Sequence, residues 1–391
     1  MLKRVSARVL KPHALGSSYS QTTTIFPAQK GIATTHVHAP FQPNNHKKKE
    51  MVNILTADEV LEIGISLIGK NGLRRNDDGK HALFLSHFGS RPEVLATLWE
   101  VLQMTDNINA RIPENKTTDK YFRLFMITHY YLKGYHVEDV VASRFEIHEQ
   151  TLRTWVAYFI EKFAALINDY VVWPDKFQTE FIGSVDCVNF GTNEPRHPTL
   201  HKDKRYFDRK GGKAGLLYEV ALDLWSNRVM WFNGPFPPND GNDATVYKTR
   251  GLMERVPDGK WLVADKIYVG CDHISGHNSL DTPAVRDFKA RARARQESFN
   301  ARLKVFGCLR QRFRHGIAKH QTFARAVCVI VIFQMESGSP LFWFDFTLNA
   351  LKLIHIIIFK GIFIQFSLFL QKFLSKRRNQ ILLVRSKENK R

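Results

Sequence analysis

Three acidic residues lie where an ordinary structural role explains them poorly. Asp265 follows the apolar run 261–264 and precedes a turn, so it stands where a buried strand should end. Asp186 lies inside a second apolar run, EFIGSVDCVNF, where a carboxylate needs a positive partner. Glu297 lies on a long predicted helix. A turn residue and a solvated helix face are the ordinary interpretations, but the three acids together indicate a bound divalent cation.

The long helix, predicted from Pro283 to Gly307, has two distinct faces near its end. One face carries apolar residues at i, i+4 and i+7 and should pack inward: Phe299, Leu303 and Phe306. The adjacent face carries an acid, an amide and a base at i, i+3 and i+7: Glu297, Asn300 and Lys304. A sheet edge that meets this face would bring strand carboxylates to Glu297.

The elements that must position these residues fall into two regions. Residues 51–173 predict helices over 56–70, 91–104 and 117–135, followed by a helix pair within 136–165. Residues 177–340 predict strands over 180–190, 216–225 and 228–236, the last two joined by a hairpin turn at 226–227. A helix over 243–256 and the strand before Asp265 follow. Strands alternating with helices predict an α/β domain after an all-α region.

The helix pair near 136–165 suits a helix-turn-helix. The segment FEIHEQ interrupts the helical pattern, and the second helix begins with Thr151, Arg153 and Thr154. In a helix-turn-helix these early residues contact DNA, so Thr151 and Arg153 are predicted DNA-binding residues. An ordinary helical hairpin is the alternative.

The composition points to a polyanionic partner. The formal net charge of +20 favours nucleic acid, although an anionic membrane surface or a basic targeting segment would also suit it. The four cysteines are isolated, which indicates neither a disulfide framework nor a zinc knuckle. Bases are dense along the long helix and its continuation, where they should track a phosphate backbone: Arg286, Lys289, Arg291, Arg293, Arg295, Arg302, Lys304, Arg310, Arg312 and Arg314.

Both ends of the chain differ from the rest. Residues 1–50 are basic and hold no acid before Glu50, which predicts a disordered segment. A basic DNA-contacting arm, an organellar transit peptide and an untargeted tail are the alternatives. Residues 341–391 form an atypical tail, nearly apolar over 353–370 but with Lys360 inside that stretch. We favour read-through or a retained intron over a membrane anchor.

The second region resembles Harbinger-type DDE transposases, which are related to bacterial insertion-sequence transposases. The segments that carry the resemblance are SVDCVNFGTNEPRHP, AGLLYEVALDLWSNRVMWFNGPFPPNDGNDATVY, VADKIYVG and RQESFNARLKVFG. The long helix keeps most of the Y-x2-R-x3-E-x6-K pattern of the bacterial relatives through Arg293, Glu297 and Lys304, whereas Ala290 replaces the tyrosine. FEIHEQTLRTW resembles the helix-turn-helix of the family, and the resemblance covers roughly residues 80–340.

The resemblance implies an RNase H-like mixed sheet with flanking helices. Asp186, Asp265 and Glu297 would be catalytic and would bind Mg²⁺ or Mn²⁺, as hard oxygen ligands do. Arg293 and Lys304 would hold the phosphate, and Arg310, Arg312 and Arg314 would contact the DNA backbone. Asp243 aligns with a further family acid, for which we prefer helix capping to catalysis.

The implied activity is cleavage and strand transfer at transposon ends. The partners would be double-stranded DNA at terminal repeats and target sites. A separate DNA-binding helper protein and a homo-oligomer are further candidates, and no membrane is expected. The expected location is the nucleus, with an organelle as the alternative. The alternative function is a catalytically silent DNA-binding protein derived from a transposase.

Overall fold

The computed structural model describes residues 54–69, 75–105, 118–194 and 203–342. The expectations for residues 1–50 and for the tail from 343 onward, including its apolar stretch, lie outside these residues. Among the helices that the structure describes, none is both long and apolar enough to cross a membrane.

The first region is helical, as predicted. Its first helix begins with a capping box, in which Thr56 and Glu59 bond each other's backbone N–H groups. The helix over 77–88 was not predicted, because its sequence has no strong apolar period; Asn76 caps it. The helices are α1 (Ala57–Ile68), α3 (Asp77–Phe88), α4 (Pro92–Thr105), α6 (Thr118–Gly134), α7 (Glu138–Arg144), α8 (Glu149–Ala165) and α9 (Ile167–Tyr170).

The second region contains a six-stranded mixed sheet, so the α/β prediction is confirmed. Its strands are β1 (Phe181–Gly191), β2 (Phe207–Asp208), β3 (Lys213–Asp223), β4 (Val229–Phe236), β5 (Trp261–Val263) and β6 (Ile274–Ser275). The order is β2-β3-β1-β5-β6, and β4 also pairs with β3. β3 runs antiparallel to β1 and to β4, whereas β5 runs parallel to β1 and to β6. The sheet is compatible with an RNase H-like fold, and β1 is its central strand.

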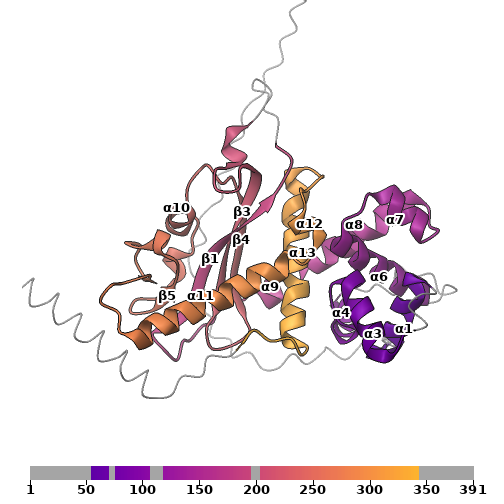
Figure 1. Ribbon diagram of the computed structural model, residues 1–391, viewed down its shortest axis with the longest axis horizontal. Coiled ribbons are helices and arrows are strands. Elements are labelled where there is room, and N and C mark those ends of the chain that lie inside the picture. Colours follow the sequence, from indigo (N-terminus) through magenta and orange to yellow (C-terminus); the bar gives the residue numbers. More distant parts are fainter. Residues whose placement is uncertain (1–53, 70–74, 106–117, 195–202, 343–391) are drawn as a thin grey trace, which may run out of the picture. The chain divides into compact units, whose positions relative to one another are not determined.

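Helices flank the sheet, and Figure 1 shows α11 running across its strands. The helices are α10 (Asp243–Thr249), α11 (Pro283–Leu303), α12 (Gly307–Arg310) and α13 (Ile317–Glu336). α10 is shorter than predicted and stops before Gly251, whose φ of 93° breaks a helix. α11 ends at Leu303 instead of near Gly307, and Lys304 is its C-terminal cap. No helix was predicted over α13.

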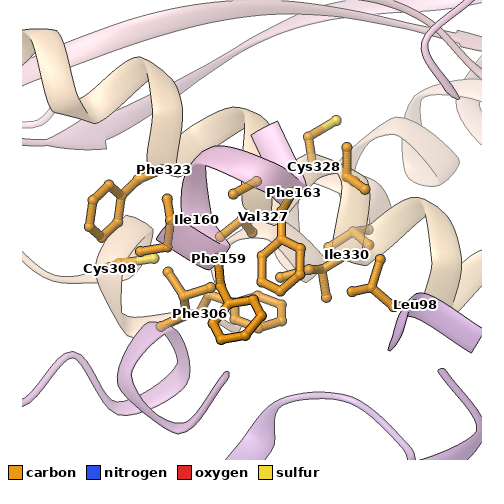
Figure 2. Close-up of a cluster of buried hydrophobic side chains, with 14 of the residues drawn as sticks. Leu98, Phe159, Ile160, Phe163, Phe306, Cys308, Phe323, Val327, Cys328 and Ile330 are labelled. Carbon is orange, nitrogen blue, oxygen red and sulfur yellow. The ribbon is translucent and has the colours of Figure 1, made fainter. Parts of the chain in front are cut away.

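A single hydrophobic cluster joins the helical region to the sheet. It includes residues from α4, α8, α12 and α13, and Figure 2 shows several of them packed together. Most of α13 is buried: the whole run from Ala326 to Ile332 is at most 1% exposed. Phe299, Leu303 and Phe306 are fully buried in the same cluster, which confirms the predicted inward face of α11. The helical region therefore packs onto the sheet domain through a shared core.

The helix pair α7–α8 forms as predicted, with its break at 145–148 and His148 as the cap of α8. Its charges do not favour a contact with phosphate, because residues 136–165 hold five acids and three bases. Arg153 is paired with Glu138 at 2.9 Å and also with Glu149. Thr151 is only partly exposed. These observations favour the ordinary helical hairpin, and DNA contact by Thr151 and Arg153 stays a prediction.

A buried histidine in the helical core should make the protein sensitive to acid. His129 is fully buried between Phe125 and Phe163, and neither ring nitrogen has a hydrogen-bond partner among the described residues. Burial lowers the pKa of His129 from 6.5 to about 3. Below about pH 6.5 the unfolded chain therefore binds a proton on His129, whereas the folded chain does not until the pH approaches 3. The contribution of neutral His129 to the free energy of unfolding is therefore fully present above pH 6.5 and decreases as the pH falls toward 3.

We expect His129→Phe to weaken this acid sensitivity. Between pH 8 and pH 5 the wild type should lose about 2 kcal/mol more free energy of unfolding than the variant does. Urea denaturation at the two pH values measures the difference. The exposed substitution His277→Phe is the control and should keep the wild-type dependence. An equal pH dependence in His129→Phe and wild type would contradict the assignment.

Candidate active-site cavity

A cavity of about 1100 Å³ opens along one end of the sheet, between β1, β5, α10, α11 and the turn that precedes β3. The three predicted carboxylates all line it, although they are far apart in the sequence. Its charged residues are five acids and six bases. The acids are Asp186, Asp208, Asp243, Asp265 and Glu297, and the bases are Arg209, Lys210, Lys213, Arg293, Lys304 and Arg310.

Asp186 lies in the middle of β1, opposite Val220 of β3. Its Oδ2 accepts a hydrogen bond from Nδ2 of Asn300 at 3.0 Å, which joins the central strand to α11. This contact confirms the predicted alignment of the polar face of α11 with the strand carboxylate. The pKa of Asp186 is raised to about 7, first by burial and then by the negative charges of neighbouring acids, among them Asp243 and Glu297.

Asp265 and Glu297 reach the same cavity from different elements. Asp265 follows β5 with one residue between, as predicted, and its side chain is half exposed. Its Oδ1 accepts a hydrogen bond from Nη1 of Arg293 at 3.3 Å. Glu297 lies one helical turn beyond Arg293 on α11 and is exposed. The Arg-x3-Glu spacing thus places the guanidinium of Arg293 beside Asp265 and one helical turn before Glu297, both of which are predicted metal ligands.

The preferred capping role for Asp243 is wrong. The cap of α10 is Asn242, whose side chain accepts from the backbone N–H of Thr245 at 3.0 Å. Asp243 is the next residue and lines the cavity instead. Burial raises its pKa, although the positive charge of Lys210 opposes the rise. The sequence did hold a signal, because Asn is as good a cap as Asp and left Asp243 free for the cavity.

The bases predicted to contact phosphate have different environments. Lys304 and Arg310 are exposed and line the cavity. Arg312 is exposed but does not line it. Arg314 donates from Nη1 and Nη2 to the carbonyl oxygens of Tyr135 and His136 at 2.7 and 2.8 Å. The guanidinium of Arg314 thus joins the 311–316 segment to the end of α6, a structural role that the sequence did not indicate.

Several bases of α11 serve the fold as well. Lys289 is buried and forms a 2.9 Å ion pair with Asp281. Arg295 is 2% exposed and donates to backbone carbonyls in the β3–β4 turn. Arg302 donates to the carbonyl oxygens of Ser339 and Pro340. The prediction that the whole basic stretch tracks a phosphate backbone is therefore wrong for these three residues.

The donor set suits a hard divalent cation by its chemistry. Among the described residues, no three His, Cys, Asp or Glu side chains lie close enough together to hold a metal ion. However, the pKa of Asp186 is raised first by burial and then by the repulsion of neighbouring carboxylates, and a bound cation would relieve that repulsion. For Asp265 to join Asp186 on one ion, it would have to leave Arg293. An exposed ion pair of this kind contributes only about 0–1 kcal/mol.

Comparison of the chain with models of protein families, with curated proteins and with solved structures finds no match.

Proposed function

We propose that the chain is a metal-dependent endonuclease and strand-transfer enzyme of the DDE transposase type, acting on double-stranded DNA. The observation that carries the proposal is the setting of Asp186, a carboxylate on the central strand. It lines a cavity shared with four other acids, Asp208, Asp243, Asp265 and Glu297. Such a group destabilises the fold unless a cation compensates it. A role in metal binding gives a reason for its presence.

The sheet supports the proposal. Neighbouring strands β4, β3 and β1 run antiparallel to one another. Strands β5 and β6 continue the sheet on the other side of β1 and run parallel to it. This order is compatible with the RNase H-like fold that the Harbinger resemblance implies. In that fold the first acid would lie on the central strand, the second after a neighbouring strand and the third on a helix. Asp186, Asp265 and Glu297 occupy such positions here.

In the proposed mechanism Asp186, Asp265 and Glu297 would hold Mg²⁺ or Mn²⁺. When bound, the ion supplies an activated water or 3′ hydroxyl and stabilises the leaving oxygen. Asn300 fixes one oxygen of Asp186 and so sets the direction of the carboxylate. Arg293 and Lys304 line the cavity on either side of Glu297 along α11 and would bind the oxygens of the reacting phosphate. No covalent bond between protein and DNA is needed.

The remaining parts of the proposal rest on the resemblance. DNA at transposon terminal repeats and at target sites would be the substrate, with a helper protein and a second copy of the chain as candidate partners and the nucleus as location. A catalytically silent DNA-binding protein is the second candidate. The observation that favours it is the pairing of Asp265 with Arg293, which keeps a predicted ligand away from the other acids.

The deciding experiment measures cleavage of duplex DNA by the full chain in Mg²⁺, in Mn²⁺ and in EDTA. The substrates are duplexes that carry candidate terminal repeats and matched duplexes without them. We expect cleavage in either metal and none in EDTA, because the carboxylates alone cannot activate water. Cleavage that persists in EDTA would overturn the metal mechanism. DNA binding without cleavage in either metal would support the silent protein.

A further inference from the structure

A basic hairpin forms one wall of the cavity. We use this name for residues 207–213, which comprise β2, a four-residue turn and the first residue of β3. Its three bases, Arg209, Lys210 and Lys213, are exposed, and all three line the cavity. No sequence pattern predicted a role for these three residues. Because they come from one short turn, they form a dense positive patch next to the carboxylates.

The basic hairpin is held in place by its one acid. The Asp208 side chain accepts from the backbone N–H groups of Lys210 and Gly211, both at 2.9 Å. The same carboxylate accepts from Nδ2 of Asn189 on β1 at 2.6 Å. The negative charge of Asp208 is therefore used within the turn, and the turn is tied to the central strand three residues beyond Asp186. The three bases stay exposed at the cavity, where the charge of Lys210 acts on Asp243.

Within the basic hairpin, Lys213 lies farther along β1 than Asp186 does. The stem of Lys213 lies along Gly191, where a Cβ would come within 3.6 Å of Cε of the lysine. Gly191 is five residues beyond Asp186 on β1, which corresponds to about 17 Å along a strand. Since each strand of B-DNA carries one charge per about 3.4 Å of helix axis, this length spans roughly five phosphates.

Two further bases line the same cavity. Lys304 lies two helical turns beyond Glu297 on α11, about 10 Å along the helix axis. Arg310 follows at the end of α12. Acids and bases thus line one cavity together: Arg293 bonds Asp265, and the charge of Lys210 acts on Asp243. If a DNA phosphate reacted at the acids, the phosphates that follow it along the strand could contact these bases.

We propose that the basic hairpin, with Lys304 and Arg310, binds the phosphate backbone of DNA and holds the segment that leads away from the carboxylates. Phosphate contacts of this kind set position and carry no base specificity. The position relative to a cleaved bond rests on the proposed function, whereas the affinity of the hairpin for phosphate does not. The two can therefore fail separately.

The test compares two triple variants of the full chain, each lacking three positive charges. The hairpin variant carries Arg209→Ala, Lys210→Ala and Lys213→Ala. The control carries Arg91→Ala, Lys176→Ala and Lys319→Ala, at exposed sites outside the cavity. Fluorescence anisotropy with a labelled duplex, in EDTA and between about 50 and 200 mM salt, gives the dependence of log K on log salt. Circular dichroism and Mn²⁺ titration calorimetry report fold and metal binding.

We expect the hairpin variant to bind at least tenfold more weakly than the control at low salt, with a slope smaller by about 2–3. Its fold and its Mn²⁺ binding should match those of the wild type. The Lys210→Arg and Lys213→Arg double variant should retain the wild-type slope. Equal slopes in the hairpin and control variants would overturn the inference, since only net charge would then matter.

The outcomes separate the two proposals. Loss of slope in the hairpin variant, with no metal-dependent cleavage by the wild type, would support the phosphate surface and reject the nuclease. Metal-dependent cleavage by the wild type, with an unchanged salt slope in the hairpin variant, would support the nuclease and reject the phosphate-binding role of the hairpin. A wild type that binds no duplex would overturn both.

Discussion

Asp186→Asn is expected to lower the rate of metal-dependent DNA cleavage on the order of 10³-fold, the loss typical when a group that stabilises transition-state charge is removed. The amide keeps the shape of the side chain but removes the charge that would hold Mg²⁺. Because the substitution changes only the side chain and leaves the backbone intact, β1 and its pairing with β3 should persist. Single-turnover cleavage assays in Mg²⁺ and Mn²⁺ measure the effect.

The same substitution has a second readout that needs no activity. The pKa of Asp186 is raised to about 7 in the fold, so its contribution to stability is full below the unfolded value and is lost as the pH rises through 7. Without metal, Asp186→Asn should be more stable than wild type at pH 8. This advantage should grow by about 2.5 kcal/mol between pH 5 and pH 8. Added Mg²⁺ should shrink it, because only the wild type gains a bound ion.

Two comparisons make the result decisive. Asp258→Asn, at an exposed acid outside the cavity, should leave both cleavage and stability unchanged. A cleavage rate in Asp186→Asn within tenfold of the wild type would contradict the catalytic role. A stability gap that Mg²⁺ does not alter would contradict metal binding at this carboxylate.

Arg295→Ala should destabilise the fold by roughly 3 kcal/mol or more, although the residue stands two positions from a predicted phosphate ligand. The buried guanidinium donates to the carbonyl oxygens of Asp223 and Ser226 in the β3–β4 turn. Its removal leaves these acceptors without their partner and opens a cavity beside α11. Burial lowers the pKa of Arg295 to about 10, so the side chain stays charged at neutral pH.

Urea denaturation of the two proteins measures the loss. Arg286→Ala, at the exposed start of α11, is the matched control and should change the free energy of unfolding by no more than about 0.5 kcal/mol. Arg295→Met should destabilise less than Arg295→Ala, because the apolar stem is kept. If Arg295→Ala lowers DNA affinity while the stability is unchanged, the residue belongs to the phosphate-contacting surface after all.

Local spacing explains what could be predicted about the candidate site. The i, i+3 and i+7 positions on a helix share a face whatever surrounds it, so Asn300 was correctly placed beside the strand carboxylates. Apolar runs with turn residues between them were enough to predict β1, β3 and β4. Asp265 was expected at a strand end because the residues before it are all apolar.

Some local patterns were ambiguous. The nearly continuous apolar residues from Ala326 to Phe333 have no helical period, because this part of α13 is buried on all sides. At the start of α10 two adjacent residues could both serve as the cap, and only the structure shows that Asn242 does so. The neighbouring Asp243 is thereby directed into the cavity, beside the carboxylate of Asp186.

The sequence by itself determined which residues carry charge and which positions share a helix face or strand. It did not determine which charges are used inside the fold. Arg293 and Arg295 are two positions apart on α11, roughly 200° around the helix; one lies at the cavity and the other is buried against the β3–β4 turn. The strand order and the packing of α11 decided this difference. They also brought the basic hairpin to the acids, since contacts between distant segments depend on which surfaces the whole chain buries together.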